Sequence, residues 1–254
     1  MIVPRYYENL SVLHENTMPA RAYYIPASRR MDNLVEHREE SDRMQLLNGT
    51  WKFQYFNSIY DIQDSFFEKN YDTENFDEIQ VPSVWQMAGY DTHQYTNIRY
   101  PFPFDPPYVP QDIPCGVYVH TFEYSRDEKA PKSFLNFEGV DSCFYVWING
   151  SYIGYSQVSH MTSEFDVTDV LQDGMNTVAV LVMKWCDGSY LYRYVTLPFL
   201  YYNRNTTIFN CLRNHFYHIS ADYLPVHTSK YFSSPPRGAH PARRAFSFIG
   251  RNFL

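Results

Sequence analysis

The sequence predicts an all-β protein built around a jelly-roll β-sandwich. Aromatic residues make up 19% of the chain, which holds 16 prolines but only 10 glycines, and this composition favours strands and ordered loops over helical bundles. Runs of alternating apolar residues recur at the spacing of about eight to twelve residues that is typical of sandwiches, with turn residues between them. Because no long helical pattern separates the runs, two antiparallel sheets around one core are expected.

The core is expected to begin in MQLLNGTWKFQYF, residues 44–56. Trp51, Phe53 and Tyr55 alternate there with polar residues, which predicts a half-buried strand. Residues 61–82 are acidic and amphipathic, typical of a surface crossing that ends in a short strand at 78–82. Residues 81–118 hold seven prolines among aromatics and predict a long ordered loop, of the kind that is usually functional or buried.

Six further runs predict the remaining strands. In CFYVWINGSYIGYS, two alternating runs flank Asn149-Gly150, the residue pair that a tight type I′ hairpin needs. Residues 176–185 have a continuously apolar centre, as expected of a strand buried on both faces. The six runs are residues 116–125, 133–139, 142–150, 151–157, 163–171 and 176–185.

The two ends of the chain differ from this centre. In residues 1–45 the apolar residues follow no sustained helical or strand period. This predicts an extended N-terminal arm with one short helical turn, either solvated or docked on another domain or subunit. Residues 1–192 carry a net charge of −14 and residues 193–254 a net charge of +7. Since the last glutamate is Glu164 and the last tryptophan Trp185, the final block does not look like a continuation of the body.

Composition also restricts the class of function. No window approaches the ~20 apolar residues of a membrane span, and the N-terminus is not that of a signal peptide, so a cytoplasmic protein without a membrane partner is expected. The four cysteines lie far apart with no CxxC pair, which argues against a zinc site or a disulfide framework. The acidic body argues against nucleic acid as a partner.

Two acidic turns are the candidate sites. Asp187 follows Trp185 at the end of the apolar strand and precedes Gly188-Ser189; from spacing alone, a turn in which this aspartate caps its own backbone is the commoner explanation. Asp141 lies in the turn EGVDS, residues 138–142, where solvated acids are common. The aromatics and amides of VWQMAGYDTHQYTN, residues 84–97, suit a carbohydrate site and ordinary loop packing equally. His93, His120 and His160 show no ligand spacing for a metal.

Several motifs, taken together, resemble one known family. These motifs are LLNGTWKF, VPSVWQMAGYDTHQYTNIRYPF, PPYVP, GVYVHTF, FEGVDSCFYVWINGSYIGYSQ, SEFDVTDVL and VLVMKWCDGSYL. Over about residues 40–191 they are similar to the N-terminal sugar-binding domain of β-galactosidases of glycoside hydrolase family 2. The resemblance implies a jelly roll packed on a later (β/α)8 barrel. That barrel carries the two glutamates of a retaining hydrolysis, and neither glutamate is expected in this chain, so whether it is an enzyme is left open.

The resemblance also implies roles for single residues. Asp187 matches the aspartate that binds galactose and a sodium ion. The resemblance therefore favours a binding role for Asp187 over a turn in which it only caps its own backbone. Asp141 matches a sugar-contacting position at which the best-known members have asparagine; an aspartate accepts hydrogen bonds there but does not donate them. Trp185, Gly188 and Tyr190 are expected to support the Asp187 loop. Sodium and magnesium are the cofactors of the full-length family.

The family pattern is expected to continue with EDQD and a GIFRDVYL-like strand, whereas this chain continues YRYVTLPFLYYNRNTTIFN from residue 192. We therefore expect an extension at 1–45, the sugar-binding jelly roll at 46–191, and an out-of-frame or disordered tail at 192–254. The other two reading frames of the downstream nucleotides test this: the frameshift hypothesis fails if neither encodes the missing stretch.

Three functions remain open at this point. The first is the sugar-binding part of a β-galactosidase, inactive as a fragment, whose partners are a galactoside and the missing catalytic barrel. The second is a free-standing carbohydrate-binding module, or one that complements a separate catalytic chain. The third is a degenerate product without function.

Overall fold

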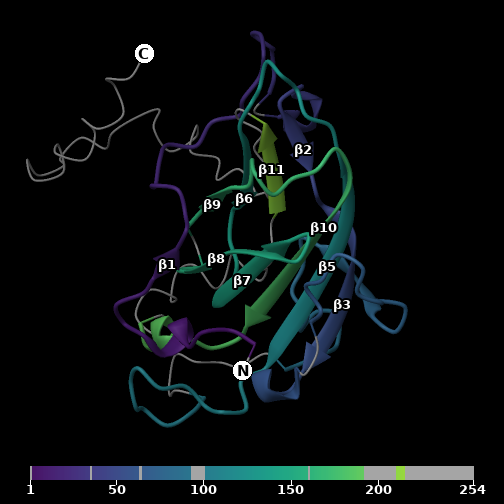
Figure 1. Ribbon diagram of the computed structural model, residues 1–254. Coiled ribbons are helices and arrows are strands. Elements are labelled where there is room, and N and C mark those ends of the chain that lie inside the picture. The colour runs from purple at the N-terminus through teal and green to yellow at the C-terminus, as the bar shows by residue number, and fades with distance from the viewer. Residues whose placement is uncertain are drawn as a thin grey trace, which may run out of the picture. The chain divides into compact units, whose positions relative to one another are not determined.

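Each run that the sequence predicts as a strand between residues 44 and 185 contains a strand in the computed structural model, and all strand pairs are antiparallel (Figure 1). The structure describes residues 2–34, 36–62, 65–92, 101–159 and 161–191, together with the backbone of 210–214. All of these belong to one structural unit, Met1–Ala221. The predicted all-β class is confirmed.

The strands form two sheets. The larger has the order β1-β8-β7-β10-β5-β3-β4 and the smaller the order β2-β11-β6-β9. The large sheet consists of β1 (His14–Glu15), β8 (Ser151–Gln157), β7 (Cys143–Ile148), β10 (Gly174–Met183), β5 (Cys115–Tyr124), β3 (Gly49–Phe56) and β4 (Asp77–Val81). The small sheet consists of β2 (Met44–Leu46), β11 (Asn210–Asn214), β6 (Ser133–Phe137) and β9 (Ser163–Asp166). Four short 3-10 helices complete the described elements: η1 (Tyr6–Glu8), η2 (Arg38–Glu40), η3 (Ile59–Asp61) and η4 (Asp187–Tyr190).

Both faces of the large sheet are buried. One face meets the small sheet across a core that includes Trp51, Phe137, Phe144 and Phe165. The opposite face is covered by loops and by the N-terminal arm, and alternate residues of the same strands, such as Tyr145, pack there. Because each central strand is covered on both sides, β7 and the end of β10 are buried at successive positions, as the apolar run at 176–185 predicts.

The β7–β8 connection is the predicted tight hairpin. Asn149 has φ 50° and Gly150 φ 85°, and positive values at both central residues are what a type I′ turn requires. The Asn149 side chain also accepts from the Thr177 amide at 3.0 Å and donates to the Val170 carbonyl at 3.1 Å. The asparagine therefore serves the turn and ties it to the neighbouring strand.

The N-terminal arm is docked on the sandwich. Val3 and Tyr7 are buried in the second core, and β1 adds to the edge of the large sheet by pairing with β8. Further along, Arg21 makes two hydrogen bonds to the Glu164 carboxylate, at 2.9 and 2.6 Å. Of the two interpretations of residues 1–45, the structure supports docking, and the surface it docks on belongs to the same chain.

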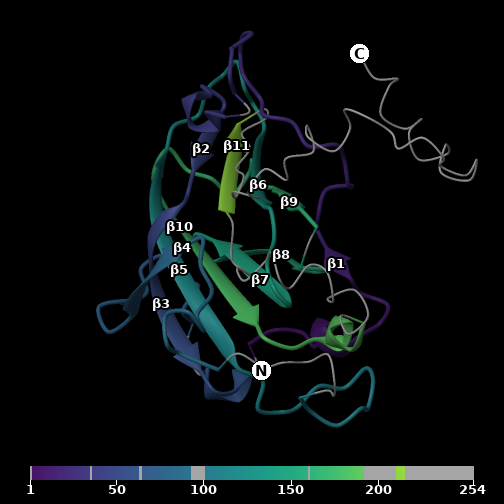
Figure 2. The same cartoon turned by 180° about the vertical axis from the view of Figure 1, so that it is seen from behind.

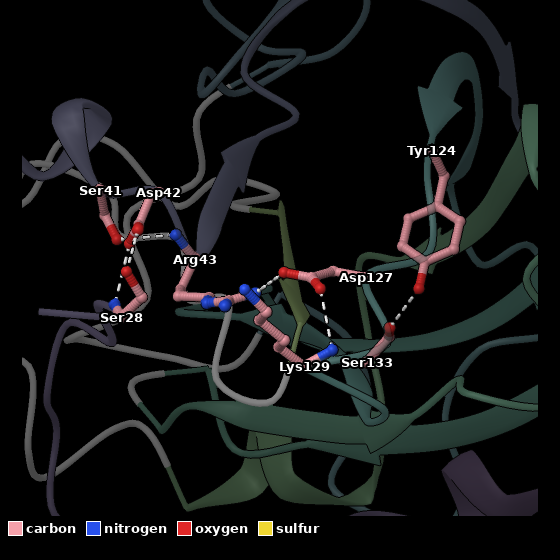
Figure 3. Close-up of polar contacts among 8 residues, drawn as sticks. All are labelled: Ser28, Ser41, Asp42, Arg43, Tyr124, Asp127, Lys129 and Ser133. Atoms are coloured by element: carbon pink, nitrogen blue, oxygen red, sulfur yellow. Dashed lines mark hydrogen bonds and ion pairs between the residues drawn. The ribbon is translucent and has the colours of Figure 1, made fainter.

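The end of the arm is fastened near β2 by polar contacts that Figure 3 shows. The Asp42 carboxylate accepts from the Ser28 amide at 2.9 Å and from its hydroxyl, and Arg43 forms an ion pair with Asp127. An open groove of about 860 Å³ lies beside these contacts. It is lined by residues 24–28 together with Arg43, Asp127 and Lys129.

Candidate functional site

Three strands of the large sheet end side by side, and their ends place both predicted acids at one edge of the sandwich. Cys143, the first residue of β7, pairs with Gln157, the last of β8, and with Met183, the last of β10. Asp141 lies two residues before β7 begins, and Asp187 lies four residues after β10 ends. The register of the sheet therefore brings together two turns that are more than forty residues apart in sequence.

The two turns are joined through Ser142. Its amide donates to the Met183 carbonyl and its hydroxyl to the Lys184 carbonyl, at 2.9 and 2.8 Å. From the other turn, the Cys186 thiol donates to the Ser142 carbonyl at 3.9 Å. These bonds fix the Asp141 turn against the loop that holds Asp187.

Asp187 is buried, with 3% of its surface exposed. Its Oδ1 accepts from the Gly188 amide at 2.7 Å, whereas Oδ2 has no hydrogen-bond partner in the described part of the chain. Burial raises the pKa of this carboxyl above its ordinary value, while the nearby Gln157 amide and the Gly188 N–H oppose the shift. The contact to Gly188 is a local cap, as the turn interpretation expects, but it leaves one buried carboxylate oxygen unpaired.

Asp141 is half-buried, and its Oδ1 accepts from the Ser159 hydroxyl at 2.6 Å. Ser159 follows β8, so this turn is held from a third strand end. One oxygen of the Asp141 carboxylate therefore already has a donor within the chain.

The three residues expected to support the loop lie around Asp187. Trp185 is half-buried and packs edge-on against Phe102, with ring centroids 5.2 Å apart. Tyr190 is buried against Phe102 and Phe104 and accepts from the Asp105 amide at 3.3 Å. Both rings thus connect the Asp187 loop to the proline-rich segment, which comprises residues 81–118.

Gly188 is a site of close approach. A Cβ atom added there would lie 3.3 Å from the Cys186 sulfur and 3.9 Å from Gln157 Oε1. A side chain at this position would therefore press on the Cys186 sulfur and would come into ordinary van der Waals contact with Gln157.

Three contacts at this end have no signal in the sequence. Lys184 Nζ lies 2.5 Å from Asp91 Oδ2, with both side chains largely buried, so an ion pair joins the Asp187 loop to the proline-rich segment. The helix η1 of the arm lies beside η4 (Figure 1), and Glu8 accepts from the Val109 amide at 3.2 Å. Pattern analysis misses such pairs because their members lie far apart in the chain.

The aromatic loop at 84–97 is in part ordinary packing. Trp85 is buried and Tyr90 half-buried, and both rings pack against Tyr55 of β3, at 6.0 and 6.2 Å. Trp85 is 4% exposed and therefore offers no face on which a sugar could stack. Residues 93–97 of the same loop, His93 included, and His160 lie outside the described residues.

The groove near β2 is separate from this site. Figures 1 and 2 both place β2 at the upper end of the sandwich, whereas η4 lies at the lower end. None of the predicted site residues lines the groove. Among the described residues, no group of three His, Cys, Asp or Glu side chains is placed to hold a metal ion, and no helix is long and apolar enough to cross a membrane.

The relatives found among curated proteins include β-galactosidases of two bacteria. The chain is 50% identical over 191 residues to a β-galactosidase of Actinobacillus pleuropneumoniae and 46% identical over 192 residues to one of Staphylococcus xylosus. Each match covers 75% of this chain but only 18% and 19% of the relative. The chain thus spans about a fifth of the length of the relatives it matches.

Among solved structures, a β-glucuronidase of Bifidobacterium dentium is similar with 20% identity and a TM-score of 0.41, covering 57% of this chain and 21% of that one. The family model described as "Glycosyl hydrolases family 2, sugar binding domain" matches residues 44–202, which is more than half of the chain. The chain therefore belongs to glycoside hydrolase family 2, and its matched part is the sugar-binding domain of that family.

Proposed function

We propose that this chain is the sugar-binding part of a β-galactosidase and that Asp187 accepts hydrogen bonds from the galactose unit of a β-galactoside. The observation that carries the proposal is the buried Asp187 carboxylate with its unpaired Oδ2. A buried acceptor without a partner costs about 1–3 kcal/mol, so a site that keeps one is poised for a ligand. The relatives, which are named β-galactosidases, give the sugar.

Asp141 is proposed as the second contact. It stands at the same edge, on the turn that Ser142 ties to the Asp187 loop. As a carboxylate, Asp141 accepts from sugar hydroxyls, and it therefore selects hydroxyl donors that are correctly oriented. Trp185, Gly188 and Tyr190 act by keeping the loop in place.

Asp187 also fits sodium as a single ligand. Its Oδ2 is an unpaired oxygen, the donor type that hard cations take, and the other ligands come from the sugar and from the remainder of the enzyme. Magnesium is proposed only for the full-length protein. We place the protein in the cytoplasm, which is supported by the unpaired, buried cysteines Cys115, Cys143 and Cys186.

The chemistry is proposed to need a catalytic (β/α)8 domain that supplies both glutamates, in the same polypeptide or in a complementing chain. The purified chain alone is expected to show no turnover of a chromogenic β-galactoside, because paired carboxylates for hydrolysis are assigned to that domain. Measured turnover that survives further purification would contradict this assignment.

Galactose titration of the purified chain, followed by tryptophan fluorescence, tests the binding function. We expect weak, saturable binding. The fluorescence should report it because Trp185 adjoins the site. The Asp187→Asn variant should bind about ten- to a hundredfold more weakly, because a hydrogen bond to a charged group contributes about 1.5–3 kcal/mol. Its free energy of unfolding should rise by about 1 kcal/mol, since a buried charge is removed.

The exposed Asp169 supplies the matched control. Asp169→Asn makes the same chemical change away from the site and should leave both affinity and stability unchanged. Equal affinity in wild type and Asp187→Asn would remove Asp187 from the binding site.

A further inference from the structure

Gln157 is a second buried polar residue at the Asp187 edge, and its amide is only half satisfied. It is the last residue of β8 and is 3% exposed. Its Oε1 accepts from the Tyr155 hydroxyl at 3.2 Å, whereas Nε2 has no hydrogen-bond partner in the described part of the chain. With Oε1 turned toward the Tyr155 hydroxyl, the unpaired group of the amide is Nε2, a donor.

This donor lies next to the Asp187 loop. Gln157 pairs with Cys143 across β7, Cys143 pairs with Met183 at the end of β10, and Gln157 Oε1 would lie 3.9 Å from a Cβ on Gly188. The unpaired acceptor of this edge, Asp187 Oδ2, belongs to the residue before Gly188. One buried donor and one buried acceptor, each lacking a partner, thus face the same loop.

Neither atom is accessible to solvent in the free chain, so side chains at this edge must move before a ligand hydroxyl reaches the Asp187 carboxylate. The two groups are, however, complementary to each other. Hydrogen bonds of functional sites are often long or misaligned without ligand and tighten in the complex. A small rotation of either side chain would therefore let Nε2 donate to Oδ2.

We propose that Gln157 is the positioning residue of the sugar site: its Nε2 donates to Asp187 Oδ2 as the site closes on a galactoside and so sets the direction of the carboxylate. The inference rests on the proposed role of Asp187. A carboxylate has about four acceptor positions; Gly188 takes one and Gln157 a second. The remaining positions then point in fixed directions, toward the sugar hydroxyl and the cation. The effect of Gln157 on the pKa of Asp187 supports the proximity of the two groups.

Replacement of Gln157 separates positioning from packing. Gln157→Leu keeps the approximate volume but removes the donor, and Gln157→Asn keeps the amide but shortens its reach. Both variants should weaken galactose binding about tenfold, the effect of one hydrogen bond to a charged group. Gln157→Leu should also lower the melting temperature, because the buried Tyr155 hydroxyl loses its acceptor, so affinities are compared where both proteins are fully folded. Gln172→Leu, at an exposed glutamine, is the matched control and should match wild type.

The side-chain amide resonances of Gln157 in ¹H–¹⁵N NMR give a readout that a space-filling role would not change. In wild type, galactose should move these resonances, and in Asp187→Asn that response should be lost. Unchanged affinity in Gln157→Leu, or affinity that falls only in step with stability, would overturn the proposal.

The same spectra keep this inference distinct from the proposed function. If wild type does not bind galactose, the binding function fails, and the free chain still tests whether the two side chains are neighbours. Asp187→Asn should then shift the Gln157 amide resonances without any sugar present, because it removes the charge beside that amide. Resonances that stay in place would show that Gln157 does not adjoin Asp187, which overturns the proposal.

Discussion

Gly154→Ala is expected to release the N-terminal arm and to lower the free energy of unfolding by about 3 kcal/mol, at the upper end of overpacking effects. A Cβ at Gly154 would lie 2.4 Å from the Glu15 carbonyl oxygen in β1 and 2.7 Å from the Phe165 ring in the core. One atom is backbone and the other belongs to a buried ring, so neither moves freely. Either β1 leaves β8 or Phe165 is displaced.

Limited trypsin digestion measures the release. Arg21 lies just beyond β1 and is held by the Glu164 carboxylate, so cleavage there should become faster in Gly154→Ala. Gly174→Ala is the matched control: Gly174 has φ +91° with nothing within 4 Å of an added Cβ. That variant should lose only about 1 kcal/mol from backbone strain and keep Arg21 protected. Equal digestion of both variants would show that the arm is held without β1.

Lys184→Met is expected to destabilise the chain by about 3 kcal/mol and to weaken galactose binding. Lys184 and Asp91 form a largely buried pair, with side chains 9% and 13% exposed. Removal of one member leaves the other charge buried without compensation, an effect of about 3–5 kcal/mol in deep interiors. The proline-rich segment should then loosen from the Asp187 loop, and Trp185 should lose the cation 5.2 Å above its ring.

A double variant sharpens this test. Replacing both members, as in Lys184→Met with Asp91→Leu, should recover much of the stability, since an apolar pair of similar volume substitutes well for a buried ion pair. Lys52→Met breaks a comparable pair, Lys52–Glu78, that is 40% and 61% exposed, and should change stability by less than about 1 kcal/mol. Urea denaturation of wild type, Lys184→Met, the double variant and Lys52→Met measures the free energy of unfolding of each. Equal losses in Lys184→Met and Lys52→Met would show that burial of the pair is unimportant.

The strands of the sandwich were predictable because their signals are local. The alternation in residues 143–148 and the Asn149-Gly150 turn specify a strand and a hairpin within one short segment, and the structure has both. The two-sided burial of β10 follows likewise from its apolar run. Asp187 and Asp141 could be chosen as candidates because each stands in a turn at the end of such a strand.

The setting of those candidates was not predictable. The pairing of Cys143 with both Gln157 and Met183 decides that the two turns meet, and the burial of Asp187 depends on that meeting. Lys184 and Asp91 lie 93 residues apart, and neither residue's neighbours in sequence indicate the pair. The arm is a further example, since the core cluster that buries Val3 and Tyr7 includes residues of β5, β7 and β10, which come more than a hundred residues later.

The sequence by itself determined the all-β class, the strands of the sandwich, the family motif around Asp187 and the change in composition after residue 191. Whether residues 192–254 are foreign to the family stays a prediction; β11 is the described part of that stretch, and the rest lies outside the described residues. Only the tertiary structure decided that Asp187 is buried with one unpaired oxygen, that Gln157 is buried nearby with an unpaired amide nitrogen, and that the arm and the proline-rich segment contact the loop. The physical reason is range: alternation and turn chemistry act between near neighbours, whereas burial and hydrogen-bond satisfaction depend on segments that only the closed sandwich brings together.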